Sequence, residues 1–234
     1  GGKIINNVDF YQYAARHEAV RKSLLEHHSL PLRSHWLGGG YPTIADPEDP
    51  TFNPLVVLSV VFGTITGLKL IGYAALIISG LATYGFTHTI LGYTRFGALH
   101  SGLVYGISVF LPTRLSQGNP NEIYAAFIPL CLLLLGLACQ GRRIAIVVLP
   151  FVFCTMLSDG KAHSLMAMFY IGVFCLFAAI PSTNALSDRQ EPLAPQAVYR
   201  PQEFFLLAMG LMVLGGMLRI LPAEEMIRSH GGIQ

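Results

Sequence analysis

Charged residues are scarce in this chain of 234 residues. Only 12% of them are Asp, Glu, Lys or Arg, whereas 53% are hydrophobic and the mean hydropathy is +0.53. Soluble domains carry about 25% charged residues, so the composition excludes an ordinary water-soluble globule. The net charge is only +2, and the Lys and Arg residues are scattered instead of forming a basic stripe, so we expect no nucleic-acid partner.

Cysteine is also scarce, and its placement excludes two further classes. Cys131, Cys139, Cys154 and Cys175 all lie within apolar runs, with no C-x-x-C pair and no His at ligand spacing. A zinc site or a disulfide framework is therefore not expected. The chain begins at Gly1 without a charged start and an apolar signal region. We expect it to be a fragment of a longer protein, with a further helix before Gly1.

Long apolar runs are abundant after residue 53. A helix needs about 20 residues, at roughly 1.5 Å each, to cross a hydrocarbon core of about 30 Å. We predict an all-α polytopic membrane protein with about six transmembrane helices, at residues 67–91, 98–111, 123–139, 144–157, 164–180 and 204–221. A shorter run at 54–62 fits an interfacial, re-entrant or tilted segment. The predicted organisation is a loop (1–53), a helical bundle (54–221) and a polar tail (222–234).

The first 53 residues are polar and rich in aromatic side chains. From Val8 to Leu25, charged residues alternate with apolar ones at helical spacing, which predicts an amphipathic helix on the membrane surface or on the bundle. His17 lies eight residues after Asp9, close to two helical turns, so it either shares a helix face with Asp9 or is a solvated histidine at the interface, which is the interpretation we prefer. Between residues 30 and 50, prolines and three consecutive glycines recur every few positions, so this part is predicted to be loop.

The loop charges suggest an orientation. The turns at 94–95 and 142–143 and the loop at 188–200 fall on one face if each apolar run crosses once. Because Lys and Arg are retained on the cytoplasmic side, we place the Arg142–Arg143 turn inside the cell. The loop 1–53 and the loops at 116–122 and 158–163 then lie together on the extracytoplasmic face of the plasma membrane.

The order of motifs in the first loop resembles a known superfamily. Residues 7–11 read NVDFY, residues 30–42 read LPLRSHWLGGGYP, and Pro54 opens the apolar runs. This order is similar to the first extracytoplasmic loop of the GT-C superfamily of polyprenyl-phosphate-dependent glycosyltransferases, and in particular to the pyruvoyl-tetrahydropterin-synthase-related membrane proteins. Weaker likenesses at 80–84, 93–97 and 103–110 extend the resemblance over roughly residues 5–180.

The resemblance implies an enzyme that moves a sugar from a lipid-linked polyprenyl phosphate donor to a lipid, glycan or protein acceptor. By position, Asp9 corresponds to the catalytic carboxylate, which acts as general base or metal ligand; helix capping is its other explanation. Trp36 and Tyr41 either stack on a sugar or anchor the loop at the interface. Lys161 and His163 either meet the donor phosphate or belong to a solvated turn.

A metal site and a different function also remain open. Asp46, Glu48 and Asp49 form an acidic cluster that fits a divalent cation such as Mg²⁺ or Mn²⁺, although exposed acidic turns usually bind none. A transporter or flippase is the second functional hypothesis, because Lys69 and His88 are ionisable groups in or near apolar runs. A non-catalytic assembly subunit is the third hypothesis.

Overall fold

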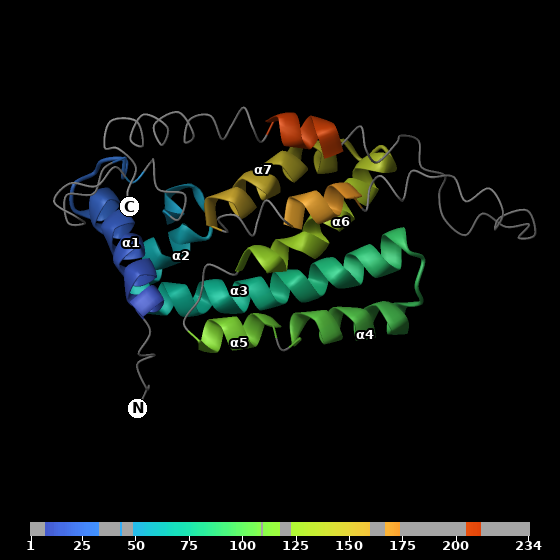
Figure 1. The fold of residues 1–234 in the computed structure, drawn as a ribbon, viewed down its shortest axis with the longest axis horizontal. Helices are drawn as coiled ribbons and strands as arrows, with labels where there is room; N and C mark the ends of the chain where they lie inside the picture. The colour runs from blue at the N-terminus through green and yellow to red at the C-terminus, as the bar shows by residue number, and fades with distance from the viewer. Residues whose placement is uncertain are drawn as a thin grey trace, which may run out of the picture.

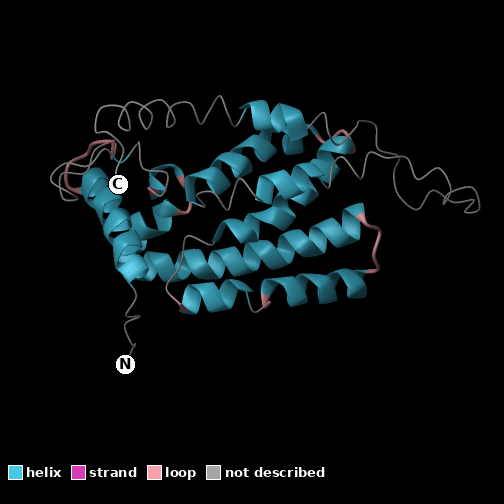
Figure 2. Ribbon diagram, in the orientation of Figure 1, coloured by secondary structure: helices cyan, strands magenta, loops and turns pink. Residues whose placement is uncertain are grey.

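The computed structural model describes residues 8–32, 43, 49–108, 110–117, 123–159, 167–173 and 205–211. In this part of the chain all regular structure is helical and no strand occurs (Figures 1 and 2). The all-α prediction is confirmed for these residues. The elements are α1 (Val8–Leu25), the 3₁₀ turn η2 (Pro50–Phe52), α2 (Val56–Phe62), α3 (Thr64–Gly85), the π-helical turn η3 (Phe86–Ile90), α4 (Arg95–Gly106), α5 (Phe110–Ser116), α6 (Tyr124–Cys139) and α7 (Arg143–Asp159). Residues 167–173 and 205–211 are also helical.

The joined helix α3–η3 has the length of a membrane span. Among the described residues, Thr64–Ile90 is the one helix that is long and apolar enough to cross a bilayer, with 27 residues and a hydropathy of 1.7. It corresponds to the predicted span at 67–91. The apolar helices Ala125–Cys139 and Arg143–Met156 are shorter, and the predicted spans at 164–180 and 204–221 are described only in part. The number of crossings stays a prediction.

The predicted span at 98–111 is wrong in one respect, because the structure breaks it. Helix α4 ends at Gly106 and α5 begins at Phe110. Pro112 explains the break: its ring would clash with the carbonyl of Ser108, four residues earlier, if the helix continued. In the first turn of a new helix the same proline is tolerated, since an N–H at that position has no intrahelical partner.

The helices are arranged in layers along α3. Figure 1 shows α4 and α5 running back along one side of α3, with α6 and α7 on the other side and α1 crossing one end of the bundle. The α3–α4 and α6–α7 turns both lie at the opposite end from α1 (Figure 1). The core lies between α3, α6 and α7, where Ile71, Leu149, Phe153 and Met156 are fully buried. Tyr13 joins this core from α1.

A side-chain hydrogen bond connects α4 to α6. Helix α6 contains Pro129, which has no N–H to donate to the carbonyl of Ala125, four residues earlier. The hydroxyl of Tyr105 donates a hydrogen bond to that carbonyl over 3.0 Å. The partner that the helix lacks is therefore supplied by a neighbouring helix.

Candidate functional site

Helix α1 carries a buried face that fixes it to the end of the bundle. Tyr13, His17 and Val20 follow one another at helical spacing, and all three are buried. His17 is 0% exposed, so the interpretation of His17 as a solvated histidine is wrong. The position of His17 in the helix explains its burial, because Tyr13, four residues before it, and Val20, three residues after it, lie on the same helix face and are apolar.

His17 is bound inside this interface. Its Nδ1 is hydrogen-bonded to Oγ of Ser59 in α2 at 2.8 Å, and its ring lies 4.7 Å from that of Tyr13, tilted by 45°. The Nε2 atom is buried and has no hydrogen-bond partner among the described residues. Burial removes water from the charged form and lowers the pKa of His17 from 6.5 to about 3. The imidazole is therefore neutral at physiological pH.

A close approach of α2 to α3 holds Ser59 in place. A Cβ atom at Gly67 would lie 2.3 Å from the Cα of Ser59, so no other residue fits there without separating the two helices. Gly63, with φ of +82°, makes the sharp turn between them. These two glycines allow the short α2 to fold back beside the first turns of α3.

Glu18 connects α1 to the start of α3. Its Oε2 accepts a hydrogen bond from the hydroxyl of Thr64, the first residue of α3, and Oε1 lies 3.3 Å from Nη1 of Arg21. A carboxylate at a helix N-terminus interacts favourably with the helix dipole. The ion pair is about one-third exposed on both sides and adds little stability by itself. Helix α1 is thus attached to both α2 and α3 through polar contacts.

A hollow of about 330 Å³ opens beside this junction. We call it the α1 hollow; its walls come from α1, α3 and α5 and include Phe10, Leu68, Lys69, Tyr73, Leu115 and Ser116. Among the described residues that line it, Lys69 is the one that carries a charge. Asp9 lies in the first turn of α1, directly before Phe10. The predicted catalytic position is therefore next in sequence to a wall of the hollow.

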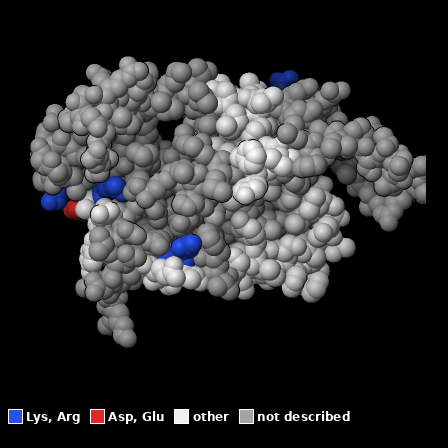
Figure 3. Space-filling model, in the orientation of Figure 1, with Lys and Arg blue, Asp and Glu red and all other residues white. Residues whose placement is uncertain are grey.

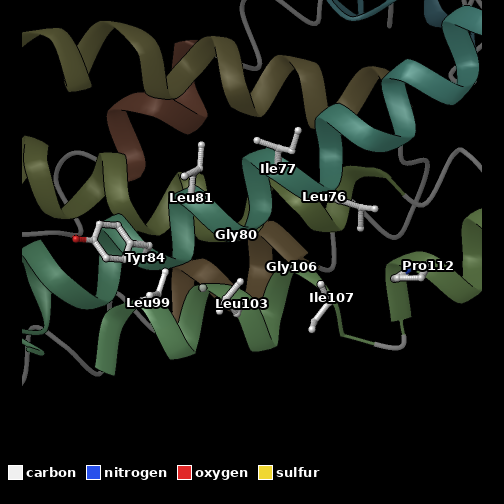
Figure 4. A pocket seen from close by; sticks show the side chains of 11 residues that line it. Leu76, Ile77, Gly80, Leu81, Tyr84, Leu99, Leu103, Gly106, Ile107 and Pro112 are labelled. Carbon is white, nitrogen blue, oxygen red and sulfur yellow. The ribbon is translucent and has the colours of Figure 1, made fainter. Parts of the chain in front are cut away.

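A second depression of about 500 Å³ continues along α3. This α3–α4 groove is lined by Ile77 and Leu81 of α3 and by Leu99, Leu103 and Ile107 of α4, among others. It shares Leu76 and Pro112 with the α1 hollow, so the two depressions adjoin. Figure 4 shows the leucine and isoleucine side chains projecting from the two helices around Gly80 and Gly106.

Glycines give the α3–α4 groove its floor. A Cβ atom at Gly102 would lie 2.7 Å from the carbonyl oxygen of Gly80, so the two backbones are nearly in contact there. Larger side chains flank this contact on both helices and leave a channel over it. Sequence patterns do not predict the groove, because it depends on which faces of α3 and α4 meet.

Charge is distributed unevenly over the described surface. In the view of Figure 3 the charged side chains lie mainly at the α1 end of the molecule, and a broad described area over α3 and α4 carries none. Arg95, Arg142 and Arg143 are exposed at the turns of the opposite end. Lys69 is the only Lys, Arg, Asp or Glu in Thr64–Ile90, and this position in an apolar run is the reason that it entered the transporter hypothesis.

The structure gives Asp49 a local structural role. Asp49 is fully buried and caps η2, where its Oδ1 accepts hydrogen bonds from the Thr51 backbone N–H over 2.9 Å and from the Thr51 hydroxyl. Asp46 and Glu48, its predicted partners in a metal site, lie outside the described residues. Within the described ranges no three His, Cys, Asp or Glu side chains are placed to share a metal ion, and the metal site stays a prediction.

The remaining predicted site residues belong to parts of the chain that the structure does not describe. These are Trp36 and Tyr41 in the first loop and Lys161 and His163 between α7 and residues 167–173. The structure instead brings together Phe10, Lys69 and Leu115, a combination that sequence reasoning missed.

Comparisons with known proteins add no relative. No protein-family model, no curated protein and no solved structure matches the chain. The described part of the chain is all-α, with one helix of membrane-spanning length and an apolar groove beside that helix.

Proposed function

We propose that this protein is a multi-pass membrane glycosyltransferase that takes a sugar from a polyprenyl phosphate donor and delivers it to an acceptor on the extracytoplasmic face. The observation that carries the proposal is the position of Asp9. In the sequence it adjoins Phe10, which lines the α1 hollow. The described walls of this hollow carry one cation, Lys69, and the hollow continues into an apolar groove. The reaction requires a carboxylate that accepts a proton and a cation that stabilises the departing phosphate. It also requires an apolar groove for the lipid part of the donor.

The arrangement of the helices supports a multi-pass topology. Two turns that carry Arg95, Arg142 and Arg143 lie at one end of the bundle, and α1 crosses the other end (Figure 1). Lys22, Lys69 and Arg114 lie at the α1 end, so the bias in Lys and Arg between the two ends is slight, and we take the end with the Arg142–Arg143 turn as the cytoplasmic one. A helix that crosses the bundle end fits a segment lying in the opposite interface. In this orientation Asp9 and the α1 hollow belong to the extracytoplasmic half.

The proposed reaction needs one proton acceptor and one stabilised leaving group. The acceptor hydroxyl or amide attacks the anomeric carbon of the donor sugar, and its proton passes to the carboxylate of Asp9. The bond between that carbon and the phosphate oxygen breaks, and its electron pair leaves with the polyprenyl phosphate. A nearby cation stabilises the charge that develops on this phosphate. No step is assigned to a metal ion.

Transfer of radiolabelled sugar from polyprenyl phosphate donors to membrane acceptors tests the proposal. We expect Asp9→Asn to abolish transfer while membrane insertion and thermal stability stay unchanged. The matched control is Glu26→Gln, an exposed acidic position beyond the end of α1, which should retain full activity. Undiminished transfer by Asp9→Asn would remove Asp9 from the mechanism, and no transfer by the unaltered protein would overturn the proposal.

One observation favours a lipid flippase as the second candidate. The α1 hollow and the α3–α4 groove together follow α3 from Lys69 to Tyr84, and a lipid that moves between leaflets needs such a path. Translocation of a fluorescent lipid phosphate by reconstituted vesicles, without any sugar transfer, would favour this candidate over the glycosyltransferase.

A further inference from the structure

The docked position of α1 leaves one polar atom of His17 unsatisfied. His17 is 0% exposed, and its Nδ1 is hydrogen-bonded to Oγ of Ser59, which is also 0% exposed. Among the described residues, the buried Nε2 has no partner for a hydrogen bond. In either neutral tautomer Nε2 is therefore an unsatisfied donor or an unsatisfied acceptor. A buried polar atom of this kind favours a state in which water reaches it.

Helix α1 lies at the end of the bundle, outside its main core. That core lies between α3, α6 and α7, and Tyr13 is the buried side chain with which α1 joins it. Figure 1 shows α1 crossing the end of the bundle instead of running along it. The other polar attachment is the hydrogen bond from Thr64 to Glu18, which is only part-buried. A segment with few buried contacts opens at a lower free energy than the core, so we expect α1 to open first.

The charges around His17 do not stabilise its protonated form in the docked position. The titratable side chains of α1 and of the segments beside it are Asp9, Tyr11, Tyr13, Arg16, Glu18, Arg21 and Lys22 on α1, Asp49 before η2, Lys69 and Tyr73 in α3 and Arg114 in α5, whereas α2 has none. Among the described residues none of them forms an ion pair with His17. Burial is therefore what lowers the pKa of His17 from 6.5 to about 3. The imidazole accepts a proton more readily once the ring is in water, so acid favours release of the helix.

We infer that α1 is a pH-sensitive lid, which leaves α2 and α3 as one helix when His17 is protonated while the core of α3, α6 and α7 stays folded. Release brings both ring nitrogens of His17 into water. It also removes Phe10, and with it one wall of the α1 hollow. The hollow is then closed on this side at neutral pH and open in acid. The inference does not depend on the proposed reaction, because it concerns only the contacts of α1.

Thiol labelling of the full chain in nanodiscs tests the lid. Val20→Cys places a thiol on the same buried face as His17, at a position that is 1% exposed, and Ala15→Cys places one at an exposed position of α1. The ratio of their labelling rates by a methanethiosulfonate reagent removes the pH dependence of the thiol itself. Because the pKa of His17 is about 3 when docked and 6.5 in water, this ratio should rise about 25-fold between pH 7 and pH 5.

The native Cys131 reports whether the bundle stays folded. It is 0% exposed in the core and should stay unlabelled at both pH values. An unchanged ratio between pH 7 and pH 5 would overturn the inference. Labelling of Cys131 in parallel with the thiol of Val20→Cys would also overturn it, because the whole bundle would then be unfolding.

Two further variants assign the effect to the contact between α1 and α2. In the Val20→Cys background, His17→Gln should make the ratio independent of pH, whereas His100→Gln, at an exposed position of α4, should keep the rise. Ser59→Ala keeps the imidazole but removes its partner, and should raise the ratio about tenfold at pH 7. Thermal melting at pH 7 confirms that the variants are folded. A rise that persists in His17→Gln, or an unchanged ratio in Ser59→Ala, would show that His17 does not control the lid.

Discussion

The hydroxyl of Tyr105 donates a hydrogen bond, 3.0 Å long, to the backbone carbonyl of Ala125. Pro129 leaves this carbonyl without an intrahelical partner, and an unpaired carbonyl in apolar surroundings costs about 1–3 kcal/mol. Tyr105, which belongs to α4, thus supplies the hydrogen-bond donor that α6 lacks at this carbonyl. The same hydrogen bond ties α4 to the first turn of α6, and α4 forms one wall of the α3–α4 groove.

Tyr105→Phe should lower the free energy of unfolding by about 1–3 kcal/mol, because the carbonyl of Ala125 loses the hydroxyl group that donates a hydrogen bond to it. In a Pro129→Ala background the cost should be much smaller, since the new residue supplies the missing N–H. Denaturant unfolding in detergent for the four proteins of this double-mutant cycle measures the difference. The control is Tyr170→Phe, because Tyr170 is 63% exposed and the loss of its hydroxyl should leave the free energy of unfolding unchanged. Equal costs in both backgrounds would contradict the explanation.

The stability of the protein should depend on pH through His17. Its pKa is about 3 in the folded state and near 6.5 when unfolded, so below pH 6.5 the unfolded chain binds the extra proton. The stability contribution is complete above pH 6.5 and is lost as the pH falls toward 3. Between pH 7 and pH 5 the loss is about 2 kcal/mol.

The comparison of His17→Gln with His100→Gln isolates this effect. Thermal melting at a series of pH values should give a flatter profile for His17→Gln, whereas His100→Gln, an exposed position on α4, should keep the profile of the unaltered protein. If both variants keep the same slope, the pH dependence comes from other groups.

The contact between Gly67 and Ser59 should not tolerate even a methyl group. Gly67→Ala places a carbon 2.3 Å from the Cα of Ser59 and should destabilise the protein by about 1–3 kcal/mol through overpacking. Gly210→Ala has open space around the new carbon and should be neutral or stabilising by up to about 1 kcal/mol, since alanine favours helix. Unfolding measurements on the two variants decide this, and equal behaviour would refute the close approach.

Asp49 should stabilise the protein as a cap whether or not a metal is present. Asp49→Ala removes the acceptor for Thr51 and should cost about 1 kcal/mol, while Asp49→Asn keeps one acceptor oxygen and should cost less. Melting curves recorded with EDTA and with added Mg²⁺ measure the loss of stability in both variants. A cost that disappears in EDTA would show that the carboxylate acts through a bound ion instead.

The sequence determined the local structure well. The amphipathic pattern at residues 8–25 predicted α1, which runs from Val8 to Leu25. The long apolar run at 67–91 predicted the helix Thr64–Ile90. Both follow from short-range physics, since side-chain periodicity and helix breakers act within a few residues. The same reasoning overlooked the effect of Pro112, which divides the predicted span at 98–111 into α4 and α5.

The tertiary structure decided what the pattern left open. The register of α1 against α2 turned His17 from an expected surface residue into a buried, neutral one that contacts Ser59. The meeting of Gly80 and Gly102 created a groove that neither helix has alone, and the fold placed Lys69 in the same hollow as Phe10. Contacts between residues far apart in the chain depend on which helix faces pack together. Composition and periodicity do not contain this information, because many pairings of apolar faces bury similar areas.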